Sequence, residues 1–151
     1  MAETIREQII SAIMTRVETI KTANGYNSEC GQSVHRAIKD LETGDIPAVV
    51  VWPQIEEIER KYGKNTCTTQ VKLEAFMAFG VINASEIQEK LLGDLVTSMT
   101  NPASPVTPLV DDLYYKEGGP AGQPDSGEII TGVSATFEIK YTYQIGNPYA
   151  Q

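Results

Sequence analysis

The sequence predicts an α/β fold of the α+β type, in which a mostly antiparallel sheet carries two helices packed on one face. Two stretches, near residues 4–20 and 85–99, repeat apolar residues with the spacing of a helix that buries one side. Other stretches alternate apolar and polar residues with the period of a strand and follow one another closely, as in hairpins. The length indicates a single domain, residues 1–151, with its own hydrophobic core.

The first predicted element is an amphipathic helix that starts after Thr4. Thr4 and Glu7 have the spacing of a capping box, and Asn24-Gly25 is expected to end the helix because both residues tolerate the left-handed conformation. The apolar positions recur every three or four residues and are Ile5, Ile9, Ile13, Val17 and Ile20. A helix with one apolar side needs a packing partner, and a sheet is the expected one.

Strands are predicted in the part of the chain that follows. Residues 33–38 predict a short strand, whereas residues 46–52 form a β-branched run typical of a strand covered on both faces. Residues 54–64 are charged and are interpreted as a polar excursion or a frayed strand. The alternation of residues 66–78 predicts a long strand with one buried and one wetter face.

The second predicted helix begins at Asn83 or Ser85 and ends near Met99. Asn83 can cap the first turn, and Glu86 places an acid where the helix dipole favours one. Gly93 in the helix interior is expected to let the helix lie close to the sheet.

The end of the chain is expected to hold an arm and a very long strand. Residues 101–127 contain five prolines and four glycines, which predicts a mobile arm in which only residues 109–115 could form a strand. Residues 129–145 then alternate without interruption, and residues 133–145 alone would span roughly 40 Å as a strand. A strand of this length is expected to extend beyond its own domain or to curve at the centre of the sheet.

The charge balance excludes several classes of partner. The formal charge is −8 and the isoelectric point is near 4.6, and the densest basic cluster is only Arg60, Lys61 and Lys64. A nucleic-acid groove needs a larger positive surface, so no direct nucleic-acid binding is expected. No stretch resembles a membrane span, and the N-terminus does not resemble a signal peptide. We therefore expect a mature N-terminus in the cytoplasm and no membrane partner.

The sequence offers no arrangement typical of catalysis, metal binding or cofactor binding. His35 is the single histidine, and Cys30 and Cys67 lack the spacing of metal ligands, so both cysteines are expected to be reduced thiols. The Gly118-Gly119-Pro120 stretch lacks the lysine of a phosphate loop. We therefore expect that the protein is not an enzyme and that it binds neither a metal nor a cofactor. The aromatic stripe of the last strand is open to two interpretations, core packing or a subunit interface.

The order of elements resembles that of the tail terminator (tail completion) proteins of long-tailed bacteriophages. The resemblance covers most of the chain, although none of its motifs is diagnostic by itself. It is carried by residues 3–20, the Gly25-Tyr26 turn, residues 46–51, residues 68–77, residues 85–99, and the end from Phe137-Glu138-Ile139-Lys140-Tyr141 through Asn147-Pro148-Tyr149.

The resemblance implies a structural virion protein of the tail or neck, made in the host cytoplasm as a late protein. Such a subunit would form a homo-oligomeric ring, commonly a hexamer, that caps the tail tube and ends its polymerisation. It would bind the tail-tube protein and offer a docking face to head-completion or neck proteins. We expect the interface in or near the last strand and the arm, at Leu109, Tyr114, Tyr115, Phe137, Tyr141, Tyr143, Pro148 and Tyr149.

Two alternatives remain open at the level of sequence. One is another phage neck or head–tail joining protein, which would bind the portal side in place of the tube. The other belongs to a different class, a small-molecule-binding or enzymatic α/β domain. A deep pocket lined by His35 and carboxylates would favour that second alternative.

Overall fold

The computed structural model describes residues 2–37, 41, 43–78, 83–121 and 130–151. Short 3₁₀ turns lie at Thr22–Asn24, Cys30–Gln32 and Thr43–Asp45. The helices are α1 (Ile5–Val17) and α2 (Ala84–Thr100), and the strands are β1 (Val34–Arg36), β2 (Ala48–Lys61), β3 (Lys64–Ala78), β4 (Asp112–Pro120) and β5 (Ile130–Gln144).

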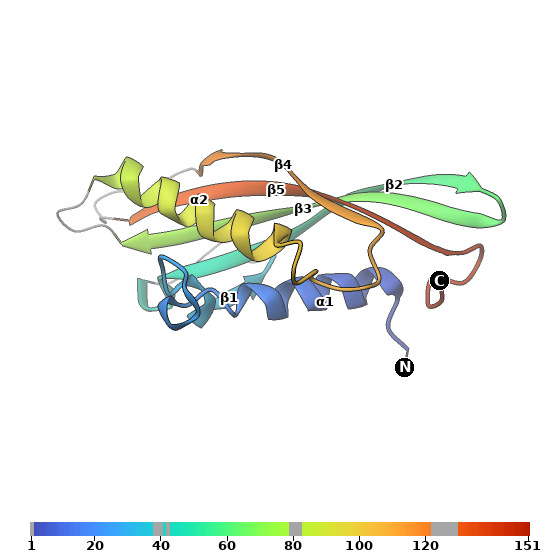
Figure 1. The fold of residues 1–151 in the computed structure, drawn as a ribbon, viewed down its shortest axis with the longest axis horizontal. Helices are drawn as coiled ribbons and strands as arrows, with labels where there is room; N and C mark the ends of the chain where they lie inside the picture. Colours follow the sequence, from blue (N-terminus) through green and yellow to red (C-terminus); the bar gives the residue numbers. More distant parts are fainter. Residues whose placement is uncertain (1, 38–40, 42, 79–82, 122–129) are drawn as a thin grey trace.

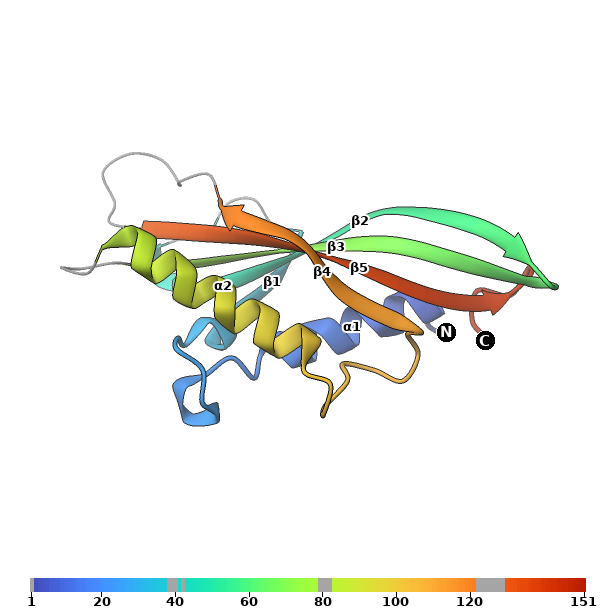
Figure 2. The ribbon, with the colours of Figure 1, turned by 45° about the horizontal axis from the view of Figure 1, so that its top comes forward.

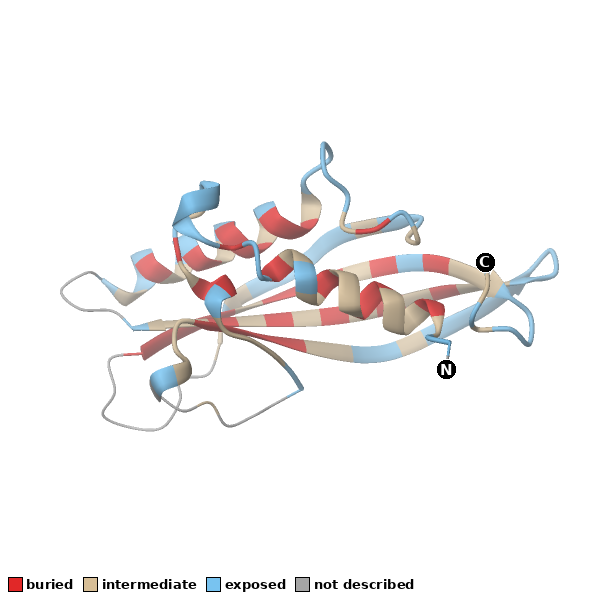
Figure 3. Ribbon diagram, turned by 90° about the horizontal axis from the view of Figure 1, so that it is seen from below, coloured by how far each residue is buried: buried red, intermediate tan, exposed pale blue. Residues whose placement is uncertain are grey.

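The strands form one five-stranded sheet in the order β1-β2-β3-β5-β4. All neighbours are antiparallel except β1 and β2, which run parallel. Both helices lie against the same face of the sheet, as Figures 1 and 3 show. The predicted α+β fold with a mostly antiparallel sheet is therefore confirmed.

The core fills the layer between the helices and this face of the sheet. Alternate residues of β3 and β5 point into it, and the two helices supply their apolar sides, because burying these surfaces is the main favourable term in folding. The largest fully buried side chains include Tyr141, Phe137, Ile9, Ile10, Ile13, Leu73, Leu91 and Leu95.

The long β2–β3 hairpin and the end of β5 extend past the helices (Figure 2). Residues 54–64, interpreted from sequence as a polar excursion or frayed strand, belong to this hairpin. Pairing continues from Glu56 opposite Thr69 to Lys61 opposite Lys64, after a bulge between Pro53 and Glu56. The long alternating β3 supplies ladder partners for a segment whose own composition does not favour a strand, so tertiary pairing decides the outcome.

The helix starts were predicted more accurately than the first helix end. The Thr4 hydroxyl accepts a hydrogen bond from the backbone N–H of Glu7 at 3.1 Å, and Asn83 caps α2 through the N–H of Ser85 at 2.9 Å. However, α1 ends at Val17 and not near Asn24-Gly25. Gly25, with φ 91°, instead closes the 3₁₀ turn that follows.

The prediction for Gly93 was wrong. This glycine lies on the exposed side of α2, and a Cβ there would meet no atom within 4 Å. The close approach between α2 and the sheet occurs at Gly118 of β4, where a Cβ would lie 2.9 Å from Leu92 Cδ1.

The predicted arm of residues 101–127 is also corrected in part. Asp112–Pro120 forms the regular strand β4, which pairs with β5 from Asp112 opposite Lys140 to Pro120 opposite Val133. Proline and glycine are tolerated there because β4 is an edge strand, whose outer N–H groups need no partner in the sheet. Residues 122–129 of the predicted arm lie outside the described residues.

Candidate assembly surfaces

Besides the outer edge of the three-residue strand β1, the sheet presents two longer strand edges without a strand partner among the described residues. One is the outer edge of β4, the last strand in the order. The other is the part of β2 from residue 54 to residue 61, because β1 pairs only with Val49, Val50 and Val51. Unpaired edges expose backbone donors and acceptors that can pair with another chain.

The protruding part of the hairpin carries three exposed apolar side chains. Ile55 is 82% exposed, Ile58 is 52% exposed and Tyr62 at the tip is fully exposed. Ile58 stands opposite the buried Cys67, so it lies on the face that carries the helices but beyond their reach. Large apolar side chains that are exposed on a projecting element are available for contact with another molecule.

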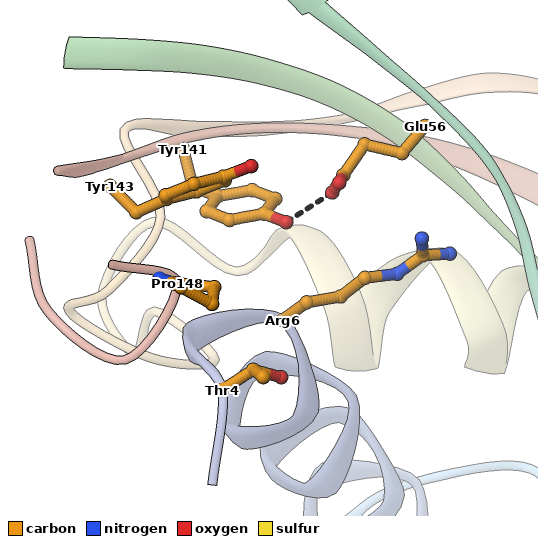
Figure 4. Close-up of a pocket in the computed structure, with 6 residues that line it drawn as sticks. All are labelled: Thr4, Arg6, Glu56, Tyr141, Tyr143 and Pro148. Carbon is orange, nitrogen blue, oxygen red and sulfur yellow. Dashed lines mark hydrogen bonds between the residues drawn. The ribbon is translucent and has the colours of Figure 1, made fainter. Parts of the chain in front are cut away.

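A small pocket lies where the start of α1, the middle of β2, the end of β5 and the C-terminal segment meet. Its volume is about 150 Å³, and Figure 4 shows the side chains around it. The lining residues are Thr4, Arg6, Glu56, Tyr141, Tyr143 and Pro148.

Hydrogen bonds organise the walls of this pocket. The Tyr141 hydroxyl donates to Glu56 Oε1, and the Arg6 guanidinium donates to the carbonyl of Gln54. Burial raises the pKa of Tyr141, and the neighbouring Glu56 raises it further, so the phenol stays protonated and remains a donor. The backbone N–H of Ile5 donates to the Pro148 carbonyl at 2.8 Å, which ties the C-terminal segment to α1.

Two of the eight predicted interface residues lie in the core. Phe137 is 0% exposed and Tyr141 is 1% exposed, so their side chains are not available to a second subunit on the surface of this fold. The sequence left core packing and interface open for this stripe; Phe137 and Tyr141 pack in the core, whereas Tyr143 is half-buried and lines the pocket. Strand alternation indicated which residues share this face, but it could not show that helices cover it.

The other six predicted interface residues are half-buried or exposed. Tyr114 and Tyr115 lie on β4 and are each 37% exposed. Leu109 packs against the core just before β4. The remaining three lie at the end of β5 and in the C-terminal segment: Tyr143 and Pro148 line the pocket, and Tyr149 is 50% exposed.

The side chains considered for catalysis, namely those of His35, Cys30 and Cys67, make contacts within the fold or are buried in it. The Nε2 atom of His35 lies 2.7 Å from the Ser33 hydroxyl, whereas the thiol of Cys30 contacts the Phe76 carbonyl at 3.8 Å. Cys30 and Cys67 are buried free thiols, and burial is the largest factor that raises the pKa of each to about 11. In the described part of the chain no group of three or more potential metal ligands comes together.

Two polar anchors were missed by the sequence analysis. The buried Asp94 accepts hydrogen bonds from the backbone N–H of Asn27 at 2.9 Å and the Ser28 hydroxyl at 2.6 Å. Arg16 donates to the carbonyls of Ser98, Ser104 and Pro105, which ties α1 to the end of α2 and to the segment after it. An acidic residue at a core position of the α2 pattern was the one signal in the sequence that pointed to Asp94.

No family model matches this chain, and a search of curated proteins finds no significant match. Neither helix is long and apolar enough to cross a membrane, and the same holds throughout the residues that the structure describes.

Proposed function

We propose that this protein is a non-enzymatic virion subunit that forms a ring on a phage tail tube, that is, a tail terminator. The ring would end tube polymerisation and offer a docking face to head-completion proteins. The observation that carries the proposal is the pair of unpaired edges, β4 on one side of the sheet and residues 54–61 of β2 on the other. A subunit with two different unpaired strand edges can bind identical copies head to tail. Such contacts close into a ring when the rotation from one subunit to the next divides a full turn.

The strand directions are compatible with this arrangement. Three successive antiparallel pairings, β2 with β3, β3 with β5 and β5 with β4, leave β4 antiparallel to β2. If β4 of one copy lies beside β2 of the next, the sheet continues with the antiparallel pairing that it already has. Arg6 of α1 reaches the carbonyl of Gln54 at the base of the hairpin, but the outer part of the hairpin extends past β1 and past the start of α1 (Figure 2), which supports access to that edge.

The size of the described pocket does not favour the small-molecule alternative. Ligand sites usually measure about 300–1,000 Å³, whereas this pocket measures about 150 Å³. His35, which the alternative requires at a pocket, is not among the residues that line it.

Sedimentation velocity and negative-stain microscopy of the purified chain test the proposal. We expect closed rings, and shorter, capped tubes when the ring is added to polymerising tail-tube protein. A neck or joining protein would form rings that bind portal complexes and leave tube length unchanged. A chain that stays monomeric at all concentrations and has no effect on tubes would refute both phage functions.

A further inference from the structure

The tip of the β2–β3 hairpin combines an unfavourable backbone conformation with a bulky, exposed side chain. Tyr62 has φ 49° and Gly63 has φ 77°, and the two residues connect Lys61 to its partner Lys64. Two-residue turns of this kind favour asparagine, aspartate or glycine at the first position, because other side chains crowd the backbone. The tyrosine side chain is fully exposed, so burial within its own chain does not compensate for this.

The tip also differs in charge from the rest of the chain. Three of its five residues are basic, namely Arg60, Lys61 and Lys64, although Glu59 just before it lies 3.5 Å from Lys61. Because the whole chain carries −8 and these three residues carry +3, the remaining residues carry −11. A second copy of this chain is therefore net negative outside its own tip, and its pocket holds one anionic side chain, Glu56, beside one cationic side chain, Arg6.

The pocket at the base of the hairpin suits a tyrosine side chain. A cavity of about 150 Å³ can hold a single benzene ring, and this pocket has that volume. Tyr143 and Pro148 provide apolar walls. The Oε1 atom of Glu56 accepts the hydrogen bond from the Tyr141 hydroxyl. Its Oε2 atom has no hydrogen-bond donor among the described residues.

A tip cannot reach the pocket of its own chain. Tyr62 lies six residues beyond Glu56 on an extended strand, which corresponds to a separation of roughly 20 Å. A hairpin tip that occupies this pocket must therefore come from another molecule.

We propose that Tyr62 at the tip of the β2–β3 hairpin inserts into the pocket of Glu56, Tyr143 and Pro148 on a second copy of this chain. Its ring packs between Tyr143 and Pro148, and its hydroxyl donates to Glu56 Oε2. Each copy then gives one tip and receives one, which is a head-to-tail contact. This inference rests on the proposed ring and names a contact that holds it together.

Chemical cross-linking tests the contact directly. A Lys64→Cys protein keeps Tyr62, and mixing it with an Arg6→Cys protein places one cysteine at the tip and one at the pocket. Native Cys30 and Cys67 are buried and do not compete. A short bis-maleimide should join the two proteins, whereas a mixture of Lys64→Cys with Lys90→Cys, on the exposed side of α2, should give background product only. Equal yields from both mixtures would overturn the proposal.

A substitution at the tip separates an assembly role from a structural one. Tyr62→Asn suits the turn, so the midpoint of thermal unfolding should rise while self-association weakens, with a dissociation constant higher by about tenfold or more. Tyr62→Phe keeps the ring and should weaken association less. A purely structural tyrosine would make stability and assembly fall together, which would contradict the inference.

The oligomer distinguishes failure of this contact from failure of the ring. Rings that form equally well with Tyr62→Asn would overturn the contact and leave the proposed function standing. Dimers cross-linked reciprocally from tip to pocket would support the contact and refute the ring. A wild-type chain that is monomeric at every concentration would refute both.

Discussion

Single side chains decide how the loop before β1 and the helix α1 are held in place. Asp94 holds the loop at Asn27 and Ser28 to α2, and the ion pair between Arg36 and Glu7 joins β1 to α1 at 2.7 Å. The first contact is buried and the second is more than a third exposed on both sides, so their expected contributions to stability differ.

Replacing Asp94 should show how much its hydrogen bonds contribute. Asp94→Ala leaves the N–H of Asn27 and the hydroxyl of Ser28 without their acceptor, and we expect it to lower the free energy of unfolding by about 3 kcal/mol. Asp94→Asn keeps one acceptor oxygen and should cost less. Urea unfolding of both variants measures the difference. An equal loss would mean that the negative charge matters more than the acceptor geometry.

The ion pair between Glu7 and Arg36 should make stability depend on pH. The hydrogen bond from Arg36 lowers the pKa of Glu7 below its usual value of 4.5. The pair therefore stabilises the fold fully above that value, and its contribution is lost as the pH falls through the lower pKa of the folded state. Because both partners are substantially exposed, the expected size is only a few tenths to about 1 kcal/mol.

Unfolding of the wild type and Glu7→Gln across this pH range checks the prediction for the ion pair. The difference in stability between the two proteins should shrink as the pH falls below 4.5. A constant difference would show that the carboxylate charge of Glu7 contributes nothing.

At the level of elements, two glycines differ sharply in their surroundings. Gly93 in α2 faces open space, whereas a Cβ on Gly31 would lie 2.6 Å from the Glu18 carbonyl oxygen and 2.7 Å from that of Val17. Gly31 thus allows the 3₁₀ turn at Cys30–Gln32 to lie directly against the end of α1. The backbone N–H of Gly31 donates to the Ile20 carbonyl there at 2.8 Å.

Substitution by alanine should therefore have opposite effects at these two positions. Gly93→Ala should raise the free energy of unfolding by roughly 0.5–1 kcal/mol, because alanine favours the helix and its methyl group meets nothing. Gly31→Ala should lower it by about 2 kcal/mol or more, because backbone atoms must move apart. Thermal unfolding of the two variants is the measurement. Destabilisation by Gly93→Ala would mean that α2 is covered on its outer side.

At the level of the whole molecule, net charge opposes the proposed assembly. Each copy carries −8, so six copies would carry −48. Salt screens repulsion between distant exposed charges more than it weakens close contacts. We therefore expect the ring fraction to rise from low to moderate ionic strength, or on addition of a basic partner.

A sedimentation series across salt concentrations measures this effect. Lys90→Arg, which keeps the positive charge, is the matched control, since it should leave the salt dependence of the ring fraction unchanged. A ring fraction that is independent of salt would show that net charge does not limit closure.

Local patterns were sufficient for the elements that determine their own conformation. The spacing of Ile5, Ile9 and Ile13 predicted α1, the caps at Thr4 and Asn83 predicted both helix starts, and alternation predicted the buried faces of β3 and β5. Helical and strand periodicity arise from backbone geometry, so they can be read without knowing the neighbours of a residue.

Long-range pairing decided the features that the sequence could not show. The charged second half of β2 is a strand because β3 lies beside it, and the Gly118-Gly119-Pro120 end of β4 belongs to a strand because β5 lies beside it. Burial of Phe137 and exposure of Tyr62 likewise depend on where the helices end above the sheet. Contacts between residues far apart in the chain set these outcomes, and local composition carries no record of them.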